Sequence, residues 1–374
     1  MNVRTLPQRF WSAAVIVVGM AAVIGVLLSM LSLSTGLSRT YLDAGRQDRA
    51  IVLNKAELNS NISRDNALTI ADSPGIKKDL DGKPIASAEI LNIMPTTKKR
   101  DNTEATLLLR GIGPKGLALR SELKLTAGRM FVAGKHEMIV GVAAQTQFGG
   151  LELGGRVRLP DGEWNIVGVF ETGGDILEGE LVSDTDTLLA SLRRDNYASL
   201  IARLESADSL GGFKQALTAN PALNISVERH SDYYANLAKP LTDFLAVVSY
   251  AVGGIMAVGA VFGALNTMYS AVSTRSVEIA TLRAIGFGAA PIVLSVLGET
   301  LFLALLGAAI GATFARVIFS GNLQAMGTNV FHLQVTPELL LLALVWTCAM
   351  ALVGGLFPAI RAARLPVALA LHAK

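Results

Sequence analysis

Residues Asn266 to Pro291, NTMYSAVSTRSVEIATLRAIGFGAAP, join two long apolar segments, and the rest of the chain is organised around this connection. Ser273 or Thr274 is suited to cap a short helix in its middle. Glycines, first among them Gly286, follow the last apolar residues of that helix and predict its end. The stretch therefore predicts a short helix at a membrane surface rather than an irregular loop.

The predicted helix has one apolar side. Ile279, Leu282 and Ile285 repeat every three residues. Arg275 and Glu278 lie elsewhere on its surface. Such a helix is suited to dock into a partner, and the alternative is a helix that rests on the membrane surface alone.

Four apolar segments are long enough to cross a membrane. Residues 11–33 carry no charge and would form a helix of about 35 Å, against roughly 30 Å of hydrocarbon. This run is longer than the core of a signal peptide, which favours a retained anchor. The three later segments span Phe244 to Leu265, Ile292 to Phe319 and Leu339 to Phe357. A composition of 51% apolar and 17% charged residues agrees with a partly embedded protein.

The basic residues predict the orientation of these helices. If the four helices alternate, one side receives most of the basic residues outside the large polar segment, and the loop 321–335 on the other side has no Lys or Arg. Both termini are therefore expected in the cytoplasm. The second and fourth helices are expected to begin outside, at Thr242-Asp243 and at Thr336-Pro337-Glu338. The basic residues concerned are Arg4, Arg9, Arg275, Arg283, Arg361, Arg364 and Lys374.

The polar segment from Ser34 to Pro240 predicts an extracytoplasmic mixed α/β domain. It holds 25 Lys plus Arg and 26 Asp plus Glu, so the overall basicity belongs to the membrane part and does not indicate nucleic-acid binding. Residues 156–159 and 164–170 flank Pro-Asp-Gly, which predicts a hairpin. Further strands are expected at 50–53, 88–93, 105–110, 137–142, 199–204 and 225–227, with helices that include one at 63–70.

The sequence carries no motif for catalysis, cofactor binding or metal binding. It has no Gly-x-x-x-x-Gly-Lys-Ser/Thr loop and no Gly-x-Ser-x-Gly elbow. His136, His230, His332 and His372 do not cluster, and each is expected to be an ordinary residue. Cys348 is the single cysteine and cannot form an internal disulfide. We therefore expect that this chain is not an enzyme.

Small residues and one acid stand out in the apolar segments. Gly259 with Gly263, and Gly307 with Gly311, are spaced four apart, which lets helices approach closely in a packed bundle or dimer. Small residues are also common in such helices without any such role. Glu299 lies about 10 Å from the inner end of its helix, so it is expected to be an interfacial charge that pairs with Arg283 or with a partner protein.

Several motifs together resemble the MacB/FtsX type of ABC transporter permease. The runs RSVEIATLRAIGF (275–287), ETLFLALLGAAIG (299–311) and FPAIRAARLPVALAL (357–371) are similar to the FtsX-like permease domain. In the polar segment, SPGI (73–76), LTAGRMF (125–131), EMIVG (137–141) and VGVF (167–170) resemble the MacB-like periplasmic core domain.

The resemblance implies an α-helical membrane bundle of four transmembrane helices. A large extracytoplasmic α/β domain is inserted between helices 1 and 2. The implied domains are 1–33 with the first helix, 34–240 as the periplasmic core, and 241–374 as the permease domain. The core would have porter-like parts near 46–95 and 196–240 and an inserted subdomain near 96–195.

The resemblance also implies partners and a mechanism. Two copies of a separate ATPase would bind ATP and Mg, and a second permease subunit, like or unlike, would complete a dimer in the inner membrane. A periplasmic adaptor and an outer-membrane channel are further partners of this type. The coupling helix would comprise Arg275, Glu278, Ile279, Leu282, Arg283 and Gly286, and a second cytoplasmic contact would comprise Arg361, Arg364 and Pro366.

Three functions remain open on the sequence. The first is export of an amphipathic or hydrophobic substrate by mechanotransmission from the ATPase. The second is a regulator that activates a periplasmic cell-wall hydrolase without transport. The third is extraction of lipoproteins for sorting to the outer membrane. The large outer domain favours the first over the second.

Overall fold

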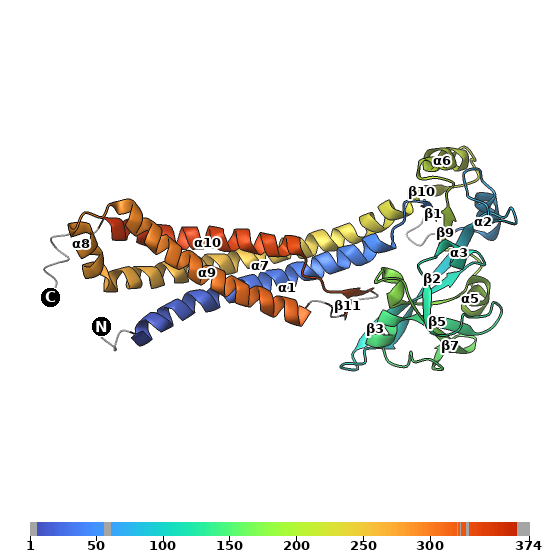
Figure 1. Cartoon of the computed structure of the whole chain (residues 1–374). Helices are drawn as coiled ribbons and strands as arrows, with labels where there is room; N and C mark the ends of the chain where they lie inside the picture. Colours follow the sequence, from blue (N-terminus) through green and yellow to red (C-terminus); the bar gives the residue numbers. More distant parts are fainter. Residues whose placement is uncertain (1–5, 56–60, 320, 322, 327–328, 365–374) are drawn as a thin grey trace. The chain divides into compact units, whose positions relative to one another are not determined.

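The chain divides into two units. The computed structural model describes residues 6–55, 61–319, 321, 323–326 and 329–364. The helical unit comprises Met1–Thr35, Leu241–Asn322 and Leu333–Lys374, and the α/β unit comprises Gly36–Pro240 and Leu323–His332. Helices α1 and α7 contribute residues to both units (Figure 1).

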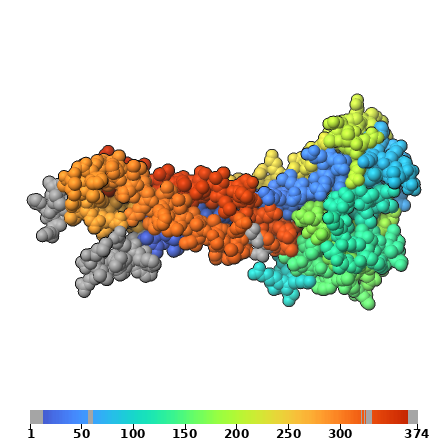
Figure 2. Space-filling view, in the orientation of Figure 1, coloured from blue at the N-terminus to red at the C-terminus, as the bar shows by residue number. Residues whose placement is uncertain are grey.

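Four helices are long and apolar enough to cross a membrane: α1 (Leu6–Ala44), α7 (His230–Thr274), α9 (Ala289–Phe319) and α10 (Pro337–Ala363). The four apolar segments of the sequence predicted them. Residues of α9 and α10, orange and red in Figure 2, form much of the visible surface of the helical unit. Phe302 and Phe314 of α9 and Leu344 of α10 are exposed, as expected of helices that meet lipid.

The predicted start of the second helix at Thr242-Asp243 is wrong, because α7 begins at His230 and continues through Pro240. A proline inside a helix removes one backbone hydrogen bond. Tyr234 and Ala238, on the preceding turns, are buried. The predicted cap of the fourth helix is confirmed, since the Thr336 hydroxyl accepts from the Leu339 N–H at 3.4 Å and Pro337 follows.

Two glycines of α9 lie directly against α1. A Cβ at Gly307 would lie 2.4 Å from the carbonyl oxygen of Val17, and one at Gly311 would lie 2.4 Å from that of Ala21. No side chain fits in either place, so these glycines set the distance between α1 and α9. Gly259 and Gly263 of α7 differ, because a Cβ there would meet no described atom within 4 Å.

The α/β unit is built on one mixed sheet in the order β10-β1-β9-β2-β3-β8-β5-β7-β4, with β6 paired to β7. The pairs β3–β8 and β5–β7 are parallel and all other pairs are antiparallel. The strands are β1 (Arg49–Asn54), β2 (Ala86–Thr97), β3 (Glu104–Ile112), β4 (Lys124–Gly128), β5 (Glu137–Gly141), β6 (Arg156–Leu159), β7 (Gly162–Glu171), β8 (Glu180–Asp184), β9 (Ser199–Arg203) and β10 (Ile225–Arg229).

Short helices cover this sheet and close its core. Trp164, Phe148 and Phe213 are the largest fully buried side chains of the core. The helices are α2 (Arg64–Ala71), α3 (Gly116–Leu119), α4 (Val142–Gln147), α5 (Thr185–Leu192) and α6 (Leu210–Thr218), with 3-10 turns η2 (Ile176–Gly179) and η3 (Ala207–Ser209). The hairpin predicted around Pro160-Asp161-Gly162 is confirmed as β6–β7.

The sequence analysis missed β4, β8 and the hairpin of β11 (Leu323–Met326) and β12 (Asn329–His332). Strand β8 lacks an apolar alternation because it buries Glu180 and Asp184, whose partners come from other elements. Strands β11 and β12 were assigned by sequence to the permease domain but belong to the α/β unit. Val330 is buried against Gly179, and the Gln147 amide donates to the Leu323 carbonyl at 3.1 Å.

Candidate functional site

The connection between α7 and α9 contains a short helix, α8 (Ser276–Ala284). The predicted cap at Ser273 or Thr274 is wrong, since α7 runs through Thr274 and Arg275 takes the cap position without a side-chain hydrogen bond. The predicted end is confirmed by Gly286, which has a φ of +109°. Only a glycine adopts this conformation at low cost, so the helix stops here.

An ion pair holds the connection against the start of α9. The two guanidinium nitrogens Nη1 and Nη2 of Arg275 donate to the Glu299 carboxylate at 2.7 and 3.1 Å. The predicted pairing of Glu299 with Arg283 is therefore wrong. Arg283 lies two turns further along α8 and donates instead to the carbonyl oxygen of Ala363 at 2.7 Å, at the end of α10.

Helix α8 turns different apolar residues in different directions. Ile279 and Ala280 are buried, whereas Leu282 is 44% exposed and Ile285 is 72% exposed. The sequence analysis placed Ile279, Leu282 and Ile285 on one side. Each step of three residues turns the helix by about 300°, so Ile285 lies about 120° from Ile279. The exposed apolar side is completed by Val277 and Phe287.

A cavity of about 340 Å³ lies between α8 and the facing turns of α7 and α9. Its polar residues are Arg275, Glu278, Ser295 and Glu299. Its apolar residues are Met268, Ala271, Val272, Ile279, Leu282, Phe287, Pro291, Ile292 and Val296.

The second predicted contact is described only in part. Arg361 lies over the ring of Tyr269, with its guanidinium carbon 5.4 Å from the ring centre. Arg364 ends α10 as its C-cap, and Pro366 lies outside the described residues. Arg361 of α10 and Arg283 of α8 thus tie the ends of three helices together at one end of the helical unit.

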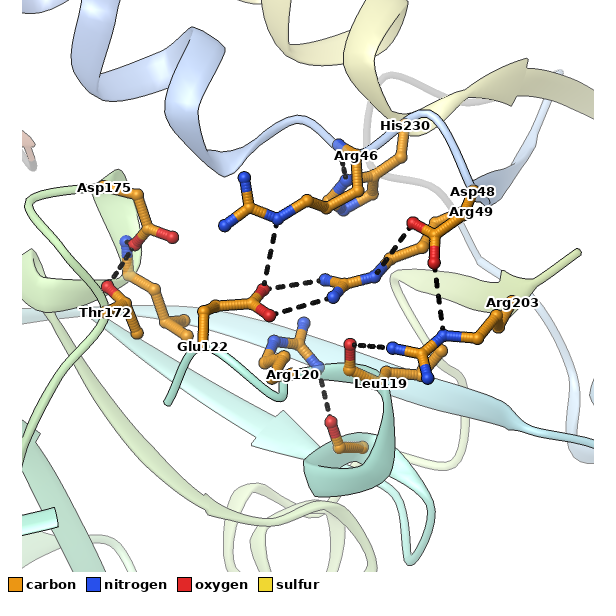
Figure 3. A network of polar contacts seen from close by, with 12 residues as sticks. Arg46, Asp48, Arg49, Leu119, Arg120, Glu122, Thr172, Asp175, Arg203 and His230 are labelled. Carbon is orange, nitrogen blue, oxygen red and sulfur yellow. Dashed lines mark hydrogen bonds and ion pairs between the residues drawn. The ribbon is translucent and has the colours of Figure 1, made fainter. Parts of the chain in front are cut away.

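The α/β unit contains a second group of charged residues, which the sequence analysis did not find (Figure 3). The Arg49 guanidinium donates to both oxygens of Glu122 at 2.9 and 3.0 Å, and Arg46 Nε lies 3.7 Å from the same carboxylate. The backbone N–H of Arg46 donates to His230 Nδ1 at 3.3 Å. These contacts join the residues just after α1 to the first residue of α7.

Behind this group lies a fully buried set of four charges. Glu89 of β2 pairs with Arg120 at 2.7 Å and with Arg110 of β3 at 3.1 Å, and Arg110 binds both oxygens of Glu180 on β8 at 2.6 and 2.8 Å. Burial by itself would raise the pKa of Glu89, but the two guanidinium groups outweigh it and hold the pKa below its usual value. Glu89 is therefore ionised in the folded protein.

Two further acids shape the loop between β7 and β8. Glu178 Oε1 accepts from the backbone N–H groups of Thr172, Gly173 and Gly174 at 2.7, 2.8 and 2.8 Å. Burial raises the pKa of Asp175 to about 6, although its carboxylate accepts from the Thr172 hydroxyl and the Leu177 N–H. Among the described residues no group of three His, Cys, Asp or Glu is placed to hold a metal.

Four apolar helices and a large mixed α/β unit define a membrane protein with a folded domain outside its apolar helices. Two family models match the chain: the MacB-like periplasmic core domain over residues 12–220 and the FtsX-like permease C-terminal over residues 250–367. The chain therefore belongs to the family of permeases that combine these two domains.

Named relatives agree with this family. The macrolide export ATP-binding/permease protein MacB 2 of Yersinia pestis is 30% identical over 125 residues, which is 33% of this chain and 17% of that protein. An uncharacterized ABC transporter permease of Methanocaldococcus jannaschii is 27% identical over 136 residues, 34% of each chain. The chain thus covers at most about a third of either relative.

Among solved structures, the extracellular domain of the noncanonic ABC-type transporter YknZ from Gram-positive bacteria is similar with a TM-score of 0.36 and 18% identity. The similar region covers 48% of this chain and 99% of that domain.

Proposed function

We propose that this chain is the membrane-spanning permease subunit of an ABC transporter and that it receives force from an ATPase domain outside these 374 residues. In this proposal α8 is the coupling helix. The observation that carries it is a set of exposed apolar side chains on α8 and just after it, Val277, Leu282, Ile285 and Phe287, of which Leu282 and Phe287 also border the cavity toward α7 and α9. An apolar side on a short connecting helix needs a partner surface to cover it.

The proposed arrangement in the membrane follows the basic residues. Arg275, Arg283 and Arg361 lie at one end of the helical unit, and this end would face the cytoplasm. The α/β unit would then be an insertion between the first and second crossings, on the opposite side of an inner membrane. Both termini would be cytoplasmic.

In the proposed mechanism the ATPase pushes on α8, and the small-residue contacts make the helices move together. Gly307 and Gly311 leave no gap between α9 and α1, so a displacement of α9 also displaces α1. Helices α1 and α7 lead into the α/β unit, where Arg46 and His230 are joined by a hydrogen bond. Movement would reach the α/β unit through these residues and expel an amphipathic or hydrophobic substrate. A second permease subunit completes the proposed transporter.

The test is a reconstituted complex of the chain with its ATPase, in which ATP hydrolysis is measured with and without the permease. Leu282→Ser with Ile285→Ser should abolish the effect of the permease on hydrolysis, because the docking side becomes polar. Thr281→Ala, an exposed position on the same helix, should behave as the wild type. These variants are easier to interpret than Glu278→Ala with Arg283→Ala. Loss of Arg283 would also remove its hydrogen bond to the Ala363 carbonyl at the end of α10.

Unchanged hydrolysis in the Leu282→Ser, Ile285→Ser variant would contradict the coupling role of α8. The same preparation separates the three possible functions. Export requires ATP-dependent movement of an amphipathic substrate, lipoprotein extraction requires release of a lipoprotein from the membrane, and hydrolase regulation requires neither.

A further inference from the structure

The α/β unit contains a cavity of about 1070 Å³. It lies on the sheet face formed by β1, β9, β2 and β3, and α1 and α7 supply Tyr41, Tyr233 and Tyr234 to its wall. Its volume lies at the upper end of the range of about 300–1,000 Å³ that is usual for small-molecule sites.

The wall of this cavity is mixed, and part of it is formed by apolar side chains that are exposed. Ile93 is 61% exposed and Leu237 is 49% exposed, and both line the cavity. Single exposed aliphatic side chains are common on protein surfaces. Several that line one cavity indicate a binding surface. The remaining aliphatic lining is Ile51, Leu53, Ile90, Leu91, Leu108 and Ile176.

The rim of the same cavity is cationic. Arg193 and Arg194 lie on it with a single acid, Asp195, so the rim carries one excess positive charge. In the described part of the chain neither guanidinium forms an ion pair, and Arg194 has only a long contact of 3.4 Å to the Leu91 carbonyl. Arg110, also in the lining, is already neutralised by Glu180.

Arg193 is held in a conformation that does not suit an arginine. It ends α5 with a φ of +53°, and among the described non-glycine residues only Asn102 shares a positive φ. Glycine or asparagine is the usual residue at such a helix end. The backbone N–H groups of Arg193 and Arg194 donate to the carbonyls of Ala190 and Leu189, so the positive φ closes the helix end and leaves the Arg193 side chain at the rim of the cavity.

We propose that this cavity binds an anionic amphiphile, a molecule with an acyl chain or other apolar body and a carboxylate or phosphate head. The apolar body lies against Ile93, Leu237 and the tyrosines, and the acidic head accepts hydrogen bonds from Arg193 and Arg194. The inference rests on the proposed function and names the class of substrate that the transporter would handle.

The test uses the full chain in nanodiscs of neutral phosphatidylcholine with a photoreactive diazirine palmitic acid and, separately, its methyl ester. Labelled peptides are mapped by mass spectrometry, so that probe in the cavity is distinguished from probe in the bilayer. The acid should label residues 90–93 and 233–237 about fivefold or more above the ester, because only the acid engages the guanidinium groups.

Arg193→Gly with Arg194→Gln should lower labelling by the acid at these peptides to the level of the ester. The melting temperature should stay the same or rise, because glycine relieves the positive φ. A loss of labelling therefore cannot be a loss of folding. Ile93→Ser with Leu237→Ser should lower labelling by both probes. Arg156→Gln and Leu80→Ser, at exposed positions outside the cavity, are the matched controls.

Equal labelling by acid and ester in the wild type, or wild-type labelling in the Arg193→Gly, Arg194→Gln variant, would overturn the proposal. The measurement needs no ATPase. Its failure would leave the coupling role of α8 standing, and failure of the hydrolysis test would leave the cavity as a binding site.

Discussion

The two units of the molecule bury polar side chains in different ways. In the helical unit, the described buried polar residues are all hydroxyl residues: Ser32, Ser249, Thr300, Thr336 and Thr347. In the α/β unit they include ten ionisable residues: Arg49, Glu89, Arg110, Arg120, Glu137, Asp175, Glu178, Glu180, Asp184 and His230.

The hydroxyls of the helical unit need no partner from another element. Ser249, Thr300 and Thr347 each donate to the carbonyl four residues earlier in their own helix. Each helix thus satisfies its polar groups before it meets another helix, as lipid requires. In the α/β unit the buried charges of Glu89, Arg110 and Glu180 are satisfied only because strands β2, β3 and β8 come together. Close helix contacts at small residues are thus a feature of one unit, and buried ion pairs between strands are a feature of the other.

The largest expected effect tests the ion pairs. Glu89→Ala leaves Arg110 and Arg120 buried without this carboxylate, which should cost about 3–5 kcal/mol of folding free energy in the α/β unit. Hydrogen exchange of the β2 and β3 peptides in the full chain measures this loss. Glu163→Ala, which breaks an exposed pair with Arg156, should cost no more than about 1 kcal/mol. If Glu89→Ala and Glu163→Ala lost the same folding free energy, the buried ion pairs would not distinguish the α/β unit from the helical unit.

The next effect tests the small residues. Gly311→Val should destabilise the helical unit by up to about 3 kcal/mol, because the new Cβ would collide with the Ala21 carbonyl. Gly259→Val should cost far less in an isolated chain, since its Cβ meets no described atom. Melting temperatures in detergent compare the two variants. A larger loss for Gly259→Val would show that α7 is covered by something else, such as a second subunit.

A smaller effect depends on pH. The folded-state pKa of Asp175 is raised to about 6, so its favourable contribution to stability is complete below about pH 4 and is lost as the pH rises through 6. Asp175→Asn should therefore stabilise the protein by about 2 kcal/mol at pH 8 and have little effect at pH 4. The free energy of unfolding of the wild type and of Asp175→Asn, measured at pH 4 and at pH 8, checks the direction of this difference. A stabilisation that is greater at pH 4 would contradict it.

The smallest effect concerns an ion pair that is only half buried. The hydrogen bonds from Arg129 lower the pKa of Glu137 to about 2, and 54% of the Arg129 side chain is exposed. Solvent screening therefore limits the contribution, and Glu137→Gln should cost about 1 kcal/mol at pH 7. The difference from the wild type should shrink as the pH falls from about 4.5 towards 2. A cost like that of Glu89→Ala would mean that partial exposure does not weaken such a pair.

Local patterns in the sequence were sufficient to predict the long helices of the helical unit and some of their ends. Long uncharged runs predicted four helices, Thr336-Pro337 predicted the start of α10, and Gly286 predicted the end of α8. The partner of Glu299 could not be predicted, because it depends on how α8 turns the chain between α7 and α9. Whether Gly259, Gly263 and the coupling residues act as proposed is a prediction for experiment.

In the α/β unit the sequence predicted the elements that have a local pattern, such as the turn residues of the β6–β7 hairpin. It did not predict β8 and β12. Strand β8 contains Glu180, which is favourable only beside Arg110, and β12 comes from the far end of the chain. The four long apolar helices and the local turns were determined by the sequence itself, because hydrophobicity and backbone preference act over a few residues. The ion-pair network, the direction of Leu282 and Ile285, and the cavity beneath Arg193 were decided only by tertiary structure, because each depends on residues that the fold brings together from separate elements.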